Sequence, residues 1–329
     1  MIEYVRNNMF TPLAVQKAHK GMQGSDYFEG VELEQAKQLW VESAELALQQ
    51  AEKMEKFGIT KQLINRILEP YQYYQVLVTA TEWKNFFELR CPKYKLPKNV
   101  YNVFGEDFYE KEFKSIKDLK KSISNYLCNA PKAKQVIKDF NVLSDLGKLK
   151  INKGAAEIHM MALAECMWDV YNESAPKQLE VGQWHIPFGD TFNTLKQEDD
   201  LEDLLNDINY IPKNTLFNID FLTQAKLAIA TARCARISYE TLGDNPEINY
   251  EKDIKLHDDL LVMKHFSPFE HCAVVMNEEN YYSHIKTTKA KSFTISNNDD
   301  IYIDGPISFK DCGWSRNFKG FKQYREIIE

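Results

Sequence analysis

The strongest constraint on the fold is one long amphipathic segment, residues 31–57. Its apolar residues recur at steps of three and four, at Leu33, Ala36, Trp40, Ala44, Ala47, Ala51 and Met54. That spacing puts one apolar stripe on a helix, and the stripe needs a partner surface to cover it. Gly58 ends the predicted helix, because glycine readily adopts the left-handed conformation found at helix C-termini. The chain therefore contains at least one long helix that packs against other elements.

Other segments carry weaker patterns of the same kind. Helical spacing predicts helices at 61–68, 82–90, 154–171, 221–239 and 250–264. The run YQVLVTAT at 74–81 is rich in β-branched residues and predicts a buried strand, and HCAVVM from His271 predicts a short one. The helix at 154–171 is apolar almost all round, so we expect it at the centre of the fold. Trp184 to Pro187 is predicted to lie in a loop.

Composition indicates a folded protein without a polyanionic or lipid partner. The 329 residues are 44% hydrophobic, and their net charge of −7 provides no general attraction for nucleic acid or an anionic membrane. No apolar run approaches the roughly 20 residues that span a bilayer, and the start resembles no secretory signal. Six widely spaced cysteines without a CxxC pair favour cytosolic thiols. We therefore expect a cytoplasmic protein.

Composition also changes once along the chain. From Pro92 to about Lys153, lysine, asparagine and aromatic residues dominate, and Pro92, Pro97 and Pro131 interrupt the pattern. We predict that residues 92–153 form a lysine-rich insertion with small helices of its own. Residues 1–91 and 154–329 then form the main domain.

Two clusters have side chains suited to a polar ligand. The first is VTATEWKNFFELR, in which Thr79, Thr81 and Asn85 can form hydrogen bonds near the end of the predicted strand. Arg90 ends this run, and Arg66 lies before the break at Pro70. A guanidinium group suits a phosphate or a pyrimidine edge, although each arginine taken alone is more typical of a surface ion pair.

The second cluster is HFSPFEH at 265–271, which follows the run ARCARISY ending at Tyr239. Three interpretations remain open for this dense polar corner. It lines a cofactor, it is an ordinary capped turn, or it binds a metal together with His257-Asp258, as in metal-dependent phosphohydrolases. The third interpretation would use His257, Asp258, His265 and His271.

Two further features have simple explanations. Glu157 and His159 lie on the otherwise apolar helix at 154–171, where a carboxylate and an imidazole are costly unless paired. They are either a satisfied core pair or part of a site. Cys91 adjoins Arg90 but has no nearby histidine to activate it, so we interpret it as a bystander.

Together these segments resemble the flavin-dependent thymidylate synthases of the longer bacterial and phage-like branch. The likeness rests on KQLINRILEP, VTATEWKNFFELR, AEIHMMALAE, WHIPF, ARCARISY, HDDLL with KHFSPFEH, and NFKGFKQYRE, in that order. It covers nearly all of the chain outside the insertion. The resemblance implies an α+β fold, with an antiparallel sheet flanked by long helices, assembled as a homotetramer with its sites between subunits.

The resemblance also implies a chemistry and a set of ligands. FAD takes hydride from NADPH, methylenetetrahydrofolate supplies the one-carbon unit, and dUMP becomes dTMP without a protein nucleophile. Arg66 and Arg90 then correspond to substrate ligands. The residues that correspond to FAD contacts are Thr79, Thr81, Asn85, Ser238, His265, Ser267 and Glu270. Thr79 and Thr81 replace an asparagine and an arginine of the shorter enzymes.

The chain also departs from the family pattern. The family signature, an Arg/Thr-His-Arg run followed by serine and arginine, does not occur in these residues. We expect it directly upstream of Met1 or on a separate chain, and a degenerate, non-catalytic relative is the alternative. The SPFEH motif lies near the C-terminus, as a circular permutation would place it. The segment from Gly154 to Ile158 lacks the family's glutamine. Together with the insertion, this change leaves open which pyrimidine nucleotide is the substrate.

Overall fold

The chain divides into two compact units. The structure is a computed structural model that describes residues 1–20, 26–95, 106–127, 156–188, 195–207, 219–237, 249–276, 314–315 and 318–328. Unit 1 comprises Met1–Tyr73 and Trp83–Pro176, and unit 2 comprises Tyr74–Glu82 and Lys177–Glu329. The chain therefore enters unit 2 twice, first through a short segment and then for its whole C-terminal half.

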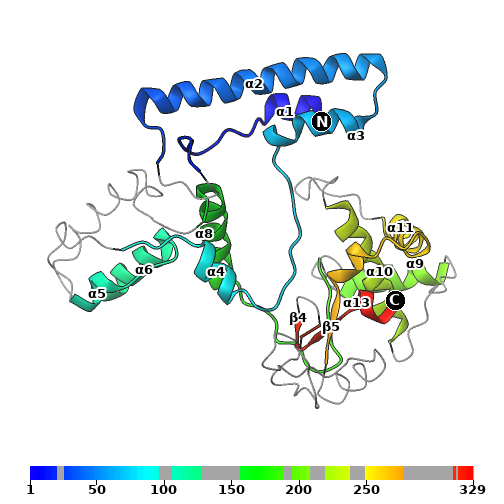
Figure 1. Ribbon diagram of the computed structural model, residues 1–329. Coiled ribbons are helices and arrows are strands. Elements are labelled where there is room, and N and C mark those ends of the chain that lie inside the picture. The colour runs from blue at the N-terminus through cyan, green and yellow to red at the C-terminus, as the bar shows by residue number, and fades with distance from the viewer. Residues whose placement is uncertain are drawn as a thin grey trace, which may run out of the picture. The chain divides into compact units, whose positions relative to one another are not determined.

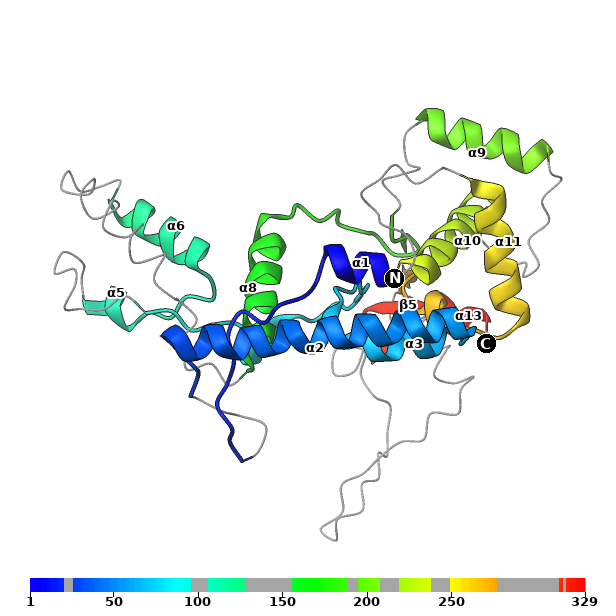
Figure 2. The same cartoon turned by 90° about the horizontal axis from the view of Figure 1, so that it is seen from above.

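Unit 1 begins with three helices, of which the first and third pack against the predicted apolar stripe of the second. They are α1 (Ile2–Asn7), α2 (Gly30–Phe57) and α3 (Lys61–Leu68), and α2 and α3 lie side by side (Figure 1 and Figure 2). Leu48 and Ala51 of α2 pack with Val5, Ile64 and Leu68 in one buried cluster. The predicted helices at 31–57 and 61–68 are thus confirmed, with their ends at Gly58 and before Pro70.

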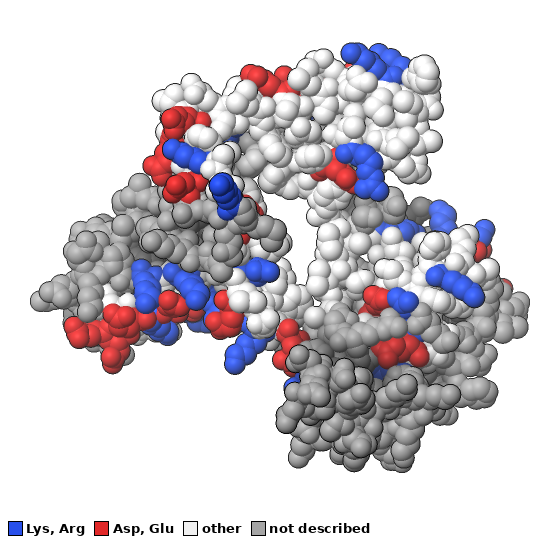
Figure 3. Space-filling view, in the orientation of Figure 1, with Lys and Arg blue, Asp and Glu red and all other residues white. Residues whose placement is uncertain are grey.

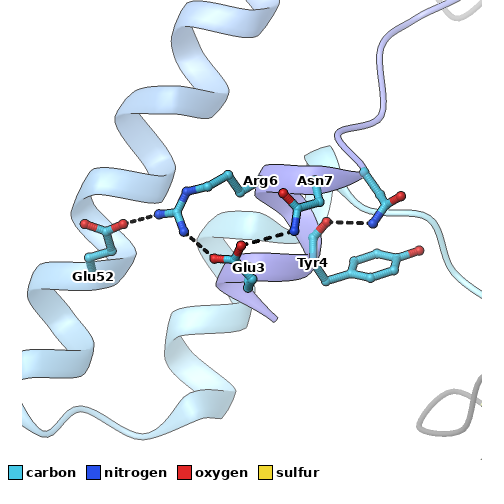
Figure 4. Close-up of polar contacts among 6 residues, drawn as sticks. Glu3, Tyr4, Arg6, Asn7 and Glu52 are labelled. Carbon is cyan, nitrogen blue, oxygen red and sulfur yellow. Dashed lines mark hydrogen bonds and ion pairs between the residues drawn. The ribbon is translucent and has the colours of Figure 1, made fainter.

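The Arg6 side chain links α1 to α2. Arg6 donates to Glu3 Oε2 at 2.6 Å within α1, and its second amino group donates to Glu52 of α2 (Figure 4). Asn7 donates to the other oxygen of Glu3 at 3.1 Å. Because all of these side chains are exposed, the network fixes a geometry and adds about 1 kcal/mol at most.

The rest of unit 1 includes α8 (Ile158–Glu173), which uses one face to hold neighbouring segments. This part of the unit also contains η1 (Glu69–Tyr71), α4 (Lys84–Arg90), α5 (Glu106–Glu110) and α6 (Ile116–Leu127). The Tyr94 hydroxyl donates to Glu165 of α8 at 2.8 Å, and the backbone N–H of Ile116 donates to the same carboxylate at 2.8 Å. The described part of the lysine-rich segment is therefore anchored on α8.

The prediction that the helix at 154–171 is central is wrong. Ile158, Met161 and Ala164 are buried, but Leu163 is 53% exposed and Val170 is 66% exposed. An apolar composition shows how much surface a helix could bury. It does not show whether other elements pack against that surface. Within the described residues of unit 2, the deeply buried helix is α10 (Phe221–Arg236), in which almost every residue from Gln224 to Cys234 is buried.

The core of unit 2 forms where three helices meet. Leu201 and Leu205 of α9 (Leu195–Asp207) pack with α10 and with Ile254 of α11 (Tyr250–Val262). Asp220 caps α10 by accepting from the backbone N–H of Thr223 at 2.8 Å, and Asn249 caps α11 in the same way. The helices predicted at 221–239 and 250–264 are therefore confirmed, whereas α9 was not foreseen.

Unit 2 also contains two small antiparallel sheets. Strands β1 (Trp184–His185), β2 (Ala273–Val275) and β5 (Phe321–Gln323) form one, in the order β1-β2-β5. Strands β3 (Trp314–Ser315) and β4 (Phe318–Lys319) form the other, and α13 (Tyr324–Ile328) follows β5. The described residues are thus mostly helical with a little antiparallel sheet, which is compatible with α+β.

Two predictions about strands need correction. Trp184 and His185 are not in a loop, because they pair with Val274 and Ala273. Residues 74–81 are not a buried strand: Val76 is 75% exposed and Val78 is 58% exposed. Strand propensity measures how well a side chain packs on the surface of a sheet, and neighbouring strands must form that sheet. Among the described residues, no strand pairs with 74–81.

Helices α2 and α11 end in the same motif with different residues. In α2, Gly58 has a φ of 89°, and the N–H groups of Gly58 and Ile59 donate to Glu55 and Met54. In α11, Lys264 has a φ of 59°, and the N–H groups of Lys264 and His265 donate to Leu261 and Leu260. Both pairs of bonds define a Schellman motif, in which glycine is the preferred left-handed residue.

We therefore expect Lys264→Gly to stabilise the protein. Relief of the left-handed lysine is worth about 1–2 kcal/mol, and the extra freedom of glycine in the unfolded chain removes part of it, which leaves roughly 0.5–1 kcal/mol. Urea unfolding at neutral pH measures the change. The reciprocal variant, Gly58→Ala, is expected to lose stability, and a loss in both variants would contradict the assignment.

The surface carries charges of both signs. On the face drawn in Figure 3, acidic and basic side chains of the described residues lie next to one another, without a broad field of one sign. Among the described residues, no helix is both long enough and apolar enough to cross a membrane.

Candidate functional site

The predicted polar corner forms directly after α11. The Schellman turn at Lys264 redirects the chain, and Ser267–Glu270 then forms the 3-10 helix η4, with Pro268 in its first turn. Phe269 is fully buried and packs on His257 and Tyr324 at ring distances of 5.2 Å and 5.6 Å. The buried Phe269 thus anchors the corner on the core. The polar side chains of the corner remain exposed or partly exposed and can form contacts at the surface.

The carboxylate of the corner is paired with an arginine. Glu270 accepts a hydrogen bond from Arg325 of α13, and the Arg325 guanidinium lies 5.8 Å from the centre of the Phe266 ring. Both side chains are partly exposed, at 37% and 28%. Sequence analysis assigned Glu270 to the site but gave no role to Arg325, although NFKGFKQYRE was among the matched motifs.

Two histidines lie at the inner end of the corner. His271 Nδ1 is 3.0 Å from the Thr79 hydroxyl. Burial lowers the pKa of His271, with Glu270 opposing and His185 adding to the effect. Burial also lowers the pKa of His185, which lies on β1 opposite Ala273. Both imidazoles are therefore held neutral at physiological pH and can each donate one hydrogen bond and accept another.

The segment at 74–82 reaches this corner through its hydroxyls. Besides the bond between Thr79 and His271, the Thr81 hydroxyl accepts from the backbone N–H of Lys319 on β4 at 2.7 Å. Thr79 and Thr81 are 192 and 238 positions away in sequence from the residues that they contact, His271 and Lys319. Unit 2 therefore brings VTAT and SPFEH together, as a common site requires.

The predicted site residues fall into three groups. Thr79, Thr81, His265, Ser267 and Glu270 belong to unit 2, where His265 and Ser267 are exposed. Arg66, Asn85 and Arg90 belong to unit 1. Ser238 lies outside the described residues. Each unit is described by itself, so convergence of the arginines with the corner remains a prediction.

The three residues in unit 1 are exposed on helices. Arg66 of α3 is 73% exposed and donates to Glu69 at 3.1 Å, as the surface ion-pair interpretation expects. Asn85 and Arg90 are exposed on α4. Arg90 forms no ion pair with any residue in the described ranges. Its guanidinium is therefore accessible to an anionic ligand.

The pair Glu157 and His159 is satisfied locally. Glu157 caps α8 by accepting from the N–H groups of His159 and Met160, and its carboxylate lies 2.6 Å from His159 Nδ1. The other ring nitrogen of His159 accepts from the N–H of Leu13 at 2.9 Å. This geometry is that of the satisfied pair, although it lies at the surface and not in the core.

The geometry does not favour the metal-site interpretation. The described residues contain no group of three or more His, Cys, Asp or Glu side chains placed to hold a metal ion. His257 is buried, with Nδ1 3.0 Å from Asp258 and Nε2 3.3 Å from the Tyr324 hydroxyl. Its ring also stacks on Tyr324, so His257 serves the core.

The buried thiols are poor nucleophiles. Burial raises the pKa of Cys91 to about 11 and that of Cys234 to about 12. The Cys91 thiol also donates to the carbonyl of Ala164 at 3.4 Å. The thiolate is therefore scarce at neutral pH, which agrees with the bystander interpretation of Cys91.

The histidine pair predicts an acid-labile unit 2. Because the folded pKa values of His185 and His271 lie below the ordinary 6.5, the unfolded chain binds more protons, and stability falls as pH drops below about 6.5. Urea midpoints between pH 7.5 and 5 measure this decline. The double variant His185→Gln, His271→Gln is expected to flatten the profile in that window. A slope that is unchanged in the double variant would contradict the assignment.

Comparison of the whole chain with protein-family models, with curated proteins and with solved structures found no match.

Proposed function

We propose that the chain acts as an FAD-dependent thymidylate synthase, which methylates dUMP to dTMP with methylenetetrahydrofolate and NADPH. One observation carries the proposal. Thr79 and His271 are 192 positions apart, yet they form a hydrogen bond. They come from the two motifs that the resemblance assigns to the flavin. Motifs that share a ligand are expected to meet in space.

The donor set of the corner suits the polar edge of a flavin. An isoalloxazine ring presents carbonyl oxygens and ring nitrogens, which need both donors and acceptors. The Thr79 hydroxyl and the neutral His271 imidazole supply both. Glu270 adds an acceptor whose charge Arg325 offsets. Bound FAD would supply the hydride that the methylation consumes.

The residues of this chain then have distinct tasks. Thr79, Thr81 and the corner would orient the flavin, while Arg90 and Arg66 would bind the phosphate or the pyrimidine edge of dUMP. Pre-positioned donors of this kind act by fixing the geometry of the reactants. The resemblance further implies a cytoplasmic homotetramer.

Release of tritium from 5-tritiated dUMP tests the proposal. The purified full chain, supplied with FAD, NADPH and methylenetetrahydrofolate, is expected to release tritium as dTMP forms. Omission of FAD should abolish the release. A chain that neither releases tritium nor binds FAD or dUMP is not such an enzyme.

A second candidate is a non-catalytic or split member of the same family. The observation that favours it is the lack of an Arg-His-Arg signature in these 329 residues. Such a protein would bind FAD through the corner and would need a second chain to turn over dUMP. Turnover by this chain alone would exclude this candidate.

A further inference from the structure

The segment that follows α1 contacts three elements of unit 1. The backbone N–H of Phe10 donates to the carbonyl of Tyr71 in η1 at 3.0 Å, and the indole N–H of Trp40 in α2 donates to the carbonyl of Phe10 at 2.8 Å. Three residues further on, the backbone N–H of Leu13 donates to Nε2 of His159 in α8 at 2.9 Å. We name residues 8–13 the strap, because they join these three elements.

One contact of the strap uses a titratable acceptor. Both hydrogen bonds of Phe10 end on carbonyl oxygens, which accept at any pH near neutral. The bond of Leu13 instead needs a lone pair on Nε2 of His159, which an imidazole has only while it is neutral. The Leu13 side chain is 56% exposed, so burial of apolar surface does little to hold this end of the strap. The end at Leu13 therefore depends on the protonation state of one ring.

The contacts of His159 define its neutral form and also favour its charged form. Nδ1 lies 2.6 Å from the Glu157 carboxylate, which accepts the proton of the neutral ring. A second proton would bind to Nε2, where it would face the N–H of Leu13. Glu157 would at the same time stabilise the positive ring as its ion-pair partner. Protonation would therefore break the bond to the strap and keep the bond to the carboxylate.

Neighbouring segments add little charge around the ring. Residues 8–13 and 71–73 contain no acidic or basic side chain, and their tyrosines carry phenols, which are neutral between pH 5 and 8. On α2, one turn before the tryptophan, Lys37 pairs with Glu34. Histidine, by contrast, is the side chain that ordinarily changes its charge in this range. Among the described residues, proton binding by His159 is thus the charge change that acts on this end of the strap.

We propose that His159 is a pH-sensitive latch, which holds the strap on α8 when its imidazole is neutral and releases the strap when its imidazole is protonated. The latch operates through one hydrogen bond, so a modest change in pH is enough to shift the balance between the two states. Because the bonds of Phe10 do not titrate, release frees the end at Leu13 and leaves the helices folded. All of these contacts lie within unit 1, so the latch does not require FAD or dUMP.

Exchange of the Leu13 amide proton with water tests the latch. In the full chain with isotope-labelled leucine and tryptophan, the protection of this amide is measured by NMR relative to the intrinsic exchange rate at each pH. It is expected to fall roughly fivefold or more between pH 7.5 and 5, as one hydrogen bond is lost. The Trp40 indole N–H should stay protected, because it donates to a carbonyl. Leu13 protection that is constant across this range would overturn the proposal.

Three variants separate the latch from other effects of acid. His159→Gln has an acceptor that does not titrate, so its Leu13 protection should not change with pH. Glu157→Gln lacks the carboxylate that stabilises the charged ring, so its transition should move to lower pH by about half a unit or more. His19→Gln removes an exposed histidine outside the latch and should behave as the wild type does.

The decisive comparison is between His159→Gln and the wild type. Equal pH profiles of Leu13 protection in these two proteins would overturn the proposal, as would loss of the transition in His19→Gln. Circular dichroism at each pH checks that the chain stays folded, so that the acid lability expected of unit 2 is not mistaken for release of the strap. None of these measurements uses FAD or dUMP, so failure of the latch and failure of the proposed function can be told apart.

Discussion

Asp253→Ala is expected to lower the free energy of unfolding by about 3–5 kcal/mol, the cost of removing one partner of a buried ion pair. Asp253 is 1% exposed on α11. It accepts from Arg233 Nε at 3.3 Å and also from Arg236, and both arginines lie on the buried helix α10. Without the carboxylate, two guanidinium groups of α10 would lose their buried counter-charge. The contact between α10 and α11 would weaken most.

Two further variants isolate the charge. Asp253→Asn keeps the shape and part of the hydrogen bonding, so its loss should be smaller than that of Asp253→Ala. Asp259→Ala removes an exposed carboxylate from the same helix and should change stability by no more than about 0.5 kcal/mol. Urea unfolding at neutral pH measures all three. If Asp253→Ala and Asp259→Ala cost the same, the buried ion pair does not hold the two helices together.

Arg90→Ala is expected to weaken dUMP binding by about 2–5 kcal/mol, a loss of roughly thirtyfold to several thousandfold in affinity. Arg90 is exposed at the end of α4, so its removal should leave folding intact. The expected loss follows from its proposed role as a fork that grips the nucleotide. Arg90→Lys should recover only part of the affinity, because an ammonium group cannot form the paired contact.

Calorimetric titration with dUMP measures this loss. Lys84→Ala, which removes an exposed cation from the same helix, is the matched control and should leave the affinity close to that of the wild type. Equal affinities for Arg90→Ala and the wild type would remove Arg90 from the substrate site. Thermal unfolding of both variants should match the wild type.

Local chemistry explains which elements could be predicted from sequence. The helix at 31–57 was predicted to within one residue because Gly58 ends it, and the helix at 61–68 because Pro70 follows. The prediction of a buried strand at 74–81 was wrong, because strand propensity does not show which residues will be buried, and Val76 and Val78 are exposed. Helix α9 was missed because acidic residues surround Leu201 and Leu205, the pair that it buries.

The candidate site divides in the same way. The polar corner could be located from sequence because its residues are neighbours along the chain. Its partners could not, because Arg325 and His185 reach it through strand pairing and the turn into α13. Both residues lie in motifs that supported the resemblance. The sequence therefore marked these motifs, but it assigned no role to either residue. Helix α10 was predicted, but its deep burial was not, because Arg233 and Arg236 make it look amphipathic, whereas both arginines pair with the buried Asp253.

The central claim is that VTAT and SPFEH form one flavin site, and equilibrium titration with FAD tests it most directly. The wild type is expected to bind FAD with a shifted absorption spectrum. The double variant Thr79→Val, His271→Gln should bind at least about tenfold more weakly, through the loss of two hydrogen-bonding groups. Thr60→Val, an exposed threonine in unit 1, should bind as the wild type does. No binding by the wild type, or equal binding by the double variant, would contradict the claim.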